Sequence, residues 1–242
     1  MALPSITAPE YTTTIPSTGQ EITYRPFLVK EEKLLLIAQE SGENQEQVLA
    51  VAKILAACIT TPDIKVGEFA TFDLEYLFLK LRSKSVGEIV QLSIPHQSPA
   101  EPSGNLENSC THKTLVDINL EDIKVLPDIP ERKIQLTDNI GVSLKFPTFQ
   151  NLVDTDDLNK TEYLFDILTK CVEYVYDKDT VYSDFTQEEM SEWIDGLGQQ
   201  QFQKISEFYE NIPRVKHLVE WKCPACDKEE SLTLEGLESF FS

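Results

Sequence analysis

The stretch LVEWKCPAC, residues 218–226, decides how this chain folds, and its key feature is the pair Cys223 and Cys226. Two thiolates separated by two residues form half of a tetrahedral zinc site. Strand-like runs flank the pair, with Leu218–Lys222 before it and Ser231–Leu234 after it. The stretch therefore predicts a β-hairpin whose tip carries two metal ligands. The position of the remaining ligands is the next question.

A thioredoxin-like redox pair is the alternative interpretation of such a motif. A redox pair stands at a strand-to-helix turn, where the helix N-terminus lowers the pKa of the thiol. Strand-like runs lie on both sides of Cys223 and Cys226, so the sequence favours metal binding.

A second stretch near the middle of the chain has the same pattern. Residues 89–95, IVQLSIP, match residues 218–224, LVEWKCP, position by position. A further strand follows in both copies, at 116–123 and at 232–237. Two strand–knuckle–strand units that face each other across a metal form a zinc ribbon. We therefore predict a zinc ribbon that is split in the sequence by the residues between its halves.

The first copy lacks a cysteine where the second has one, because Ile94 occupies the position of Cys223. Its donors lie in the following loop, where His96 comes just after the proline and Cys110 and His112 stand near the end. A closed structural zinc site needs four nitrogen or sulfur ligands. The vestigial alternative is a knuckle without metal, and His96 is the substitute for the fourth ligand. The expected zinc ligands are Cys223, Cys226, Cys110 and His112.

The rest of the chain shows mainly helical periodicity. The expected helices lie at about 30–40, 45–59, 72–82, 162–175, 186–197 and 200–211. Further strands are expected at 21–29, 133–136 and 142–146. The predicted fold is α+β, with four parts: an extended arm (1–20), a helical N-terminal region (21–86), a split zinc-ribbon-like pair of β-hairpins (87–127 plus 213–242) and an inserted β/helical segment (128–212).

The composition argues against several classes of protein. Among 242 residues, 21 are basic and 41 acidic, which gives a net charge of -20 and no basic patch of the kind that nucleic-acid binders carry. No apolar run is long enough to span a membrane, and the first residues do not read as a secretory signal. We therefore expect the chain in a cytoplasm, where thiols stay reduced. Cys58 and Cys171 fall within apolar helical patterns and are expected in the core.

Motifs of the common catalytic sites are absent from the sequence. HExxH, GxSxG, the P-loop and GxGxxG do not occur, and the three histidines are scattered. We therefore predict no catalytic residues and no enzymatic activity, with a metal hydrolase as the weaker alternative. A zinc-ribbon adaptor for nucleic acid or the transcription machinery is the other alternative, but residues 216–230 carry more acidic than basic side chains.

Several stretches, taken together and in order, resemble the baseplate hub subunit family of T-even-like contractile-tailed bacteriophages. The resemblance covers almost the whole chain, from the Pro-rich start to the apolar end. The stretches are residues 24–36, 72–79, 82–88, 223–226 and 234–241.

This resemblance implies a non-enzymatic structural or assembly role in the baseplate hub of a myovirus. It implies contacts with other hub or tail proteins, and a place in the tail baseplate of the virion or in the host cytoplasm during assembly. In this family the hairpin cysteines look like zinc-ribbon ligands, and Cys223 and Cys226 match that pattern, whereas Ile94 departs from it.

Overall fold

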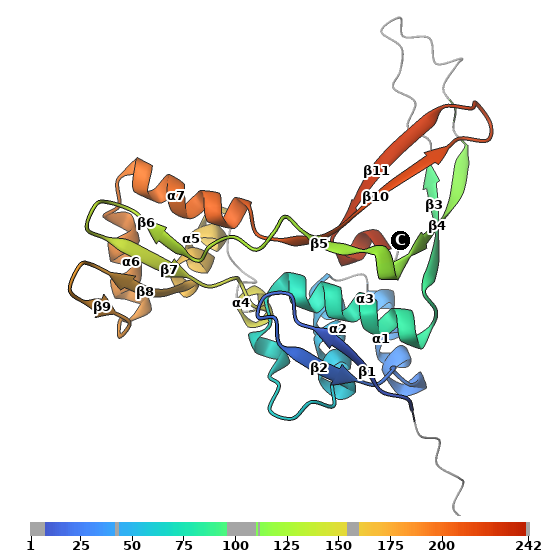
Figure 1. The fold of residues 1–242 in the computed structure, drawn as a ribbon, viewed down its shortest axis with the longest axis horizontal. Helices are drawn as coiled ribbons and strands as arrows, with labels where there is room; N and C mark the ends of the chain where they lie inside the picture. The colour runs from blue at the N-terminus through green and yellow to red at the C-terminus, as the bar shows by residue number, and fades with distance from the viewer. Residues whose placement is uncertain (1–7, 42–43, 96–109, 111, 154–159, 241–242) are drawn as a thin grey trace, which may run out of the picture.

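The computed structural model describes residues 8–41, 44–95, 110, 112–153 and 160–240, and the fold is α+β (Figure 1). The helices are α1 (Val29–Ser41), α2 (Asn44–Cys58), α3 (Thr71–Ser85), α4 (Phe149–Val153), α5 (Lys160–Lys170), α6 (Gln187–Asp195) and α7 (Gln199–Glu210), with short 3-10 helices η1 (Val66–Glu68), η3 (Leu120–Asp122) and η4 (Leu237–Phe240). The strands are β1 (Tyr11–Thr14), β2 (Glu21–Tyr24), β3 (Ile89–Pro95), β4 (Lys113–Asn119), β5 (Lys124–Leu126), β6 (Lys133–Gln135), β7 (Gly141–Leu144), β8 (Val172–Tyr176), β9 (Val181–Tyr182), β10 (Arg214–Lys222) and β11 (Glu229–Glu235). None of the described helices is long and apolar enough to cross a membrane.

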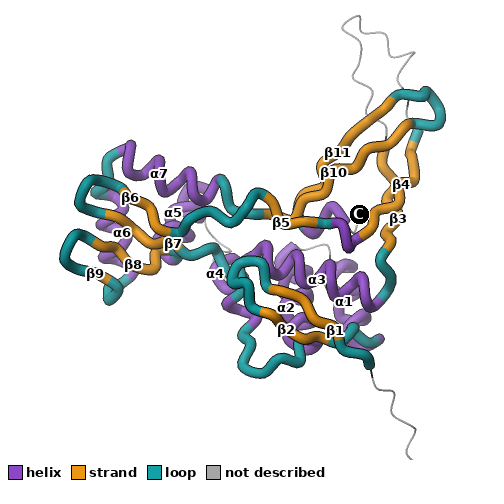
Figure 2. Tube along the Cα trace, in the orientation of Figure 1, coloured by secondary structure: helices purple, strands orange, loops and turns teal. Residues whose placement is uncertain are grey.

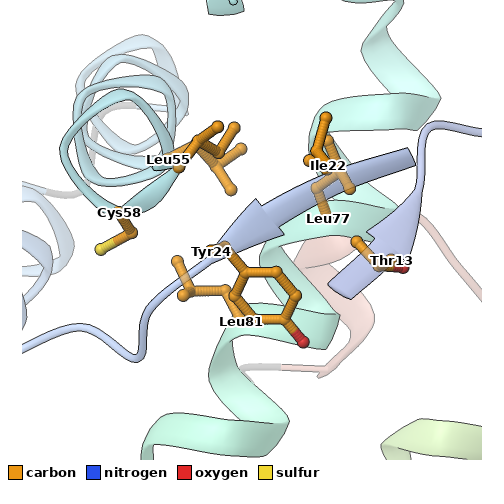
Figure 3. Close-up of a pocket in the computed structure, with 8 residues that line it drawn as sticks. Thr13, Ile22, Tyr24, Leu55, Cys58, Leu77 and Leu81 are labelled. Atoms are coloured by element: carbon orange, nitrogen blue, oxygen red, sulfur yellow. The ribbon is translucent and has the colours of Figure 1, made fainter. Parts of the chain in front are cut away.

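The N-terminal part is a helical body, made of α1, α2 and α3 and covered by the hairpin β1–β2 (Figure 2). α1 packs chiefly on α2, and α2 packs on α3. Ile22 and Tyr24 of β2 meet Leu55 and Cys58 of α2 around a void of only about 10 Å³ (Figure 3). The three helices stand where apolar periodicity predicts them, because each buries one stripe in this tight core.

The predicted extended arm at residues 1–20 is in part a strand of this hairpin. β1 pairs with β2, and Ile15 just after it is buried. Ser17 donates hydrogen bonds to the Asp73 carboxylate, from its amide over 2.9 Å and from its hydroxyl over 2.5 Å. Asp73 is fully buried and also accepts a hydrogen bond from the Ala70 amide. These contacts attach residues 11–20 to the body through partners that lie far away in the sequence.

The two predicted hairpins form and lie side by side (Figure 1). β3 pairs with β4, β10 pairs with β11, and the two hairpins share one apolar core. That core joins Val90 and Leu92 of the first hairpin with Val219 and Leu234 of the second. β5, which the sequence did not predict, pairs with the start of β10 and widens the second hairpin to three strands.

The segment between β5 and β10 folds around a core of its own. Its sheet has the order β6-β7-β8-β9, and α5, α6 and α7 pack against it. Val142 and Val175 of the sheet meet Ile194 of α6 and Phe208 of α7. A capping box stabilises the start of α6, because Thr186 and Glu189 hydrogen-bond to each other's backbone amides.

One predicted helix of this segment ends early. The expected helix at 162–175 stops at Lys170, and Val172–Tyr176 forms β8 instead. Apart from Glu173, this strand consists of valines and tyrosines, and it pairs with both β7 and β9. The apolar spacing of α5 continues past Lys170, and no glycine or proline marks the end of the helix. Pairing with the neighbouring strands therefore decides that Val172–Tyr176 is a strand.

α3 connects the three parts, because its side chains enter all three cores. Phe78 belongs to the core of the helical body, Phe72 to that of the inserted segment, and Leu79 to that of the hairpins. Lys80 of α3 also forms an ion pair with Glu121 of η3, the turn that follows β4. Burial opposes the ionisation of Glu121, yet its hydrogen bonds, the one from Lys80 first, lower its pKa to about 2. The hairpins are thus fixed to the helical body by packing and by charge.

Candidate metal centre

The cysteines of the two hairpins lie at neighbouring tips. Cys223 and Cys226 occupy the turn between β10 and β11, and Cys110 precedes β4. The turn is closed by two backbone hydrogen bonds, from the Cys223 amide to the Lys228 carbonyl over 2.8 Å and from the Asp227 amide to the Cys223 carbonyl over 2.9 Å. Asp227 has a positive φ of 59°, which turns the chain toward β11. This closed turn fixes the spacing of its two thiols.

The Sγ atoms of Cys110, Cys223 and Cys226 all lie within 4.8 Å of one another. The Sγ atoms of Cys110 and Cys223 are 3.7 Å apart, and the cysteines are free thiols. Two sulfurs bound to one tetrahedral zinc, each at about 2.3 Å, are about 3.8 Å apart. Cys223 is fully buried, whereas Cys110 and Cys226 are partly exposed. The donor type and the Cys110–Cys223 spacing both fit a thiolate metal site.

The three thiols differ in how readily they ionise. Burial opposes ionisation of Cys223, but hydrogen bonds from the backbone at Ala225 and Cys226 lower the pKa of its thiol to about 6. A hydrogen bond from the Lys228 backbone acts to lower the pKa of Cys226, but burial and the neighbouring sulfurs of Cys223 and Cys110 raise it overall. Thiolates are the form that binds metal, so Cys223 is prepared for that role at neutral pH.

Of the two histidines named from the sequence, only His112 lies within the described residues. His112 is exposed and lies outside the group of ligand atoms within 4.8 Å of one another. His96 lies outside the described residues. A single residue separates Cys110 from His112, which gives less reach around one metal than the two residues of a CxxC turn. The structure thus brings together three of the four residues in the predicted ligand set.

Ile94 fills a packing position in the first hairpin. It is buried in the core that the two hairpins share, opposite Thr114 of β4. Two buried polar atoms near the tips, Thr114 Oγ1 and Trp221 Nε1, have no hydrogen-bond partner within the described part of the chain. No motif in the sequence marks these two side chains.

The other two cysteines lie far from the hairpin tips, in apolar cores. Cys58 and Cys171 are both buried, in the helical body and in the inserted segment respectively. Burial raises the pKa of each thiol to about 11. Both therefore stay protonated and serve as small apolar residues, which confirms the prediction.

A family model described as T4 bacteriophage base plate protein matches residues 8–242. No curated protein matches the chain, and no solved structure matches it. The family match runs through the helical body, both hairpins and the inserted segment, and it confirms the resemblance of the sequence to baseplate proteins of T-even-like phages. The chain therefore belongs to the family of T4 bacteriophage base plate proteins.

Proposed function

We propose that this chain is a structural or assembly component of the baseplate hub of a phage tail, and that it acts through protein–protein contacts without enzymatic activity. The observation that carries the proposal is the family match, which spans residues 8–242. Membership of a baseplate family supports a location in the tail of the virion and contacts with other tail proteins. A role in the host cytoplasm during assembly belongs to the same proposal.

The described surface supports a role in protein contacts. Large apolar side chains are exposed on each part of the molecule, and such surface favours association when it is covered by a partner. Examples are Val29, Leu36 and Ile37 on α1, Ile89 and Leu115 on the first hairpin, Leu218 on the second, and Val181 on β9.

The charges of the second hairpin do not favour the alternative of a nucleic-acid adaptor. Arg214 and Lys216 both pair with Glu235, and Lys222 pairs with Asp227. A side chain held by a carboxylate is less available to a phosphate, and a nucleic-acid interface needs several free cations. The hub proposal is therefore preferred.

We also propose that a zinc ion, held by Cys110, Cys223 and Cys226 with one further donor, clamps the two hairpin tips together. His112 and His96 are the candidates for the fourth position from the sequence. The proximity of three sulfurs supports this proposal. A bound zinc would add a cross-link between segments that are distant in the sequence, in a region whose shared core is small.

Metal analysis of the purified full chain tests the zinc proposal. We expect about one zinc per chain, lost in Cys110→Ser and in Cys223→Ser. Cys58→Ala is the matched control, because it removes a thiol from a core remote from the tips, and it should keep its zinc. Wild-type protein that is folded but free of metal after expression with zinc would overturn the clamp.

Removal of the chain from its phage tests the hub proposal. The expected result is a block in tail assembly at an early step, with baseplate proteins left unassembled. A tagged copy recovered from infected cells should bring down other baseplate proteins. Tails that form normally and infect without the chain would contradict the proposal.

A further inference from the structure

Helix α1 carries a second apolar face, which the described residues leave exposed. Val29, Leu36 and Ile37 are exposed by 79%, 53% and 54% of their surface. At about 100° per residue, these three side chains and those of Lys33 and Glu40 fall within an arc of about 100° on the helix. They form one continuous strip, which we call the outer face of α1.

The opposite side of α1 makes the contacts that hold the helix in place. Ala38 is buried there, and Leu35 packs against the core of the helical body. Glu31 is buried as well and forms an ion pair with Arg25 over 2.9 Å. It also accepts a hydrogen bond from the Leu28 amide at the start of the helix. The outer face is therefore free to change without loss of the contacts that attach α1.

α1 lies at the edge of the body, because it packs chiefly on α2, and α2 in turn packs on α3. Its outer face is thus directed away from the body. A helix of a soluble domain normally shows one apolar stripe, toward its own core. A second stripe on the solvent side indicates a partner that covers it.

The charges on the outer face indicate which partner fits. Lys33 and Glu40 are both exposed and form no hydrogen bond or ion pair within the described part of the chain. They stand seven positions apart, or about 10 Å along the helix, so they are too far apart to pair with each other. The strip therefore carries one unpaired positive charge before its apolar centre and one unpaired negative charge after it.

We propose that the outer face of α1 binds the same face of a second copy of this chain, with the two helices antiparallel about a two-fold axis. An axis that passes between Leu36 and Ile37 places Leu36 of each copy at the height of Ile37 of the other. The same axis places Lys33 of each copy opposite Glu40 of the other, because residues whose numbers add to 73 face each other. A two-fold contact of this kind is self-complementary, so both charge pairs form at once.

The parallel arrangement is disfavoured by the same residues. It would set Lys33 against Lys33 and Glu40 against Glu40, and opposed like charges penalise an interface. The pattern of one cation and one anion about an apolar centre thus selects the antiparallel dimer. A single helix face buries less than the roughly 1,600 Å² of a standard interface, so the dimer forms at high protein concentration and dissociates on dilution.

Sedimentation velocity of the full chain over a concentration series tests the proposal. The average mass of the wild type should rise from monomer toward dimer. Leu36→Glu should remain monomeric over the same range. The matched control is Leu115→Glu, the same change at a side chain that is 62% exposed on β4, and it should dimerise like the wild type. Circular dichroism should show both variants folded.

Charge reversal distinguishes this antiparallel dimer from non-specific association of exposed apolar side chains. Lys33→Glu alone sets two pairs of carboxylates against each other, and Glu40→Lys alone sets two pairs of ammonium groups. Each should weaken the dimer by at least about tenfold. The double variant Lys33→Glu with Glu40→Lys restores opposite charges in the antiparallel arrangement and should recover the dimer.

Three results would overturn the proposal: a wild type that stays monomeric at all concentrations, equal weakening by Leu36→Glu and Leu115→Glu, or a double variant as weak as the singles. A monomeric wild type whose Leu36→Glu variant fails to enter baseplates would assign the face to a different protein and would likewise reject the second copy. These measurements use the isolated chain, so their failure leaves the proposed hub function standing.

Discussion

The helical body and the hairpin pair are stabilised in different ways. The body has a large apolar core into which α2, α3 and the hairpin β1–β2 all insert, and the buried Asp73 attaches its N-terminal segment. The hairpins share a smaller core and end in tips where three thiols converge. The body is held by its core and by internal hydrogen bonds, whereas the proposed zinc clamp would hold the ends of the hairpins.

The largest effect should come from the core of the body. Phe78→Ala removes a ring that is fully buried on α3, and such a cavity lowers the free energy of unfolding by about 3–5 kcal/mol. Chemical denaturation followed by circular dichroism measures it. Phe165→Ala, at a ring that is 39% exposed, is the control and should cost much less. The zinc content expected for the hairpin tips should not change in either variant. A loss of zinc in Phe78→Ala would show that the hairpin tips depend on the core of the body.

A smaller effect is expected where the N-terminal segment is attached. Asp73→Ala leaves the amides of Ser17 and Ala70 and the Ser17 hydroxyl without their acceptor, which should lower the free energy of unfolding by about 2 kcal/mol. Hydrogen exchange should become faster at Tyr11–Thr14 and leave the hairpin tips unchanged. The exposed Asp138→Ala is the control and should behave like the wild type. Unchanged exchange in β1 would show that the carboxylate does not hold this segment.

The smallest effect concerns the contact between α3 of the helical body and the second hairpin. Burial raises the pKa of Glu75 on α3 to about 7, although hydrogen bonds from the backbone at Val215 and Leu237 act to lower it. The folded state therefore holds a proton that the unfolded state has released. Stability should fall as the pH rises from about 4.5 to about 7, by about 1 kcal/mol in total because the side chain keeps some contact with solvent.

Glu75→Gln should remove this part of the pH dependence. Melting curves of the variant and the wild type at several pH values isolate it from other carboxylates. Glu121, whose pKa is lowered to about 2, contributes in the opposite sense and at lower pH, because its stabilisation is lost as the pH falls. Equal slopes for the two proteins between pH 4.5 and 7 would contradict the assignment.

The sequence predicted those elements that a periodic or repeated pattern within a short stretch of residues specifies. The helices of the body follow from apolar residues at helical spacing, and the paired hairpins follow from the match of 89–95 with 218–224. The same match pointed to Cys110, because it stands at the end of the loop in the hairpin that faces Cys223. Each inference rests on a period or a repeat that neighbouring residues carry.

The missed parts depend on contacts between distant residues. β1 has a run of threonines without an apolar period, and it is held by β2 and Asp73. β8 follows α5 without a breaker, and only its pairing with β7 and β9 identifies it as a strand. His112 matched the donor type that zinc needs, but a side chain's direction near a strand end is not encoded in the spacing of residues. The sequence therefore predicted the convergence of the three thiols, but not the position of the His112 side chain.

Hydrogen exchange of the full chain, with and without a strong zinc chelator, tests most directly whether the body and the hairpins are held differently. Chelation should speed exchange at the tip-proximal ends of β3, β4, β10 and β11, while α2 and α3 should keep their protection. Protection that is the same with and without chelator in all four strands, or that is lost equally in the helices, would contradict it.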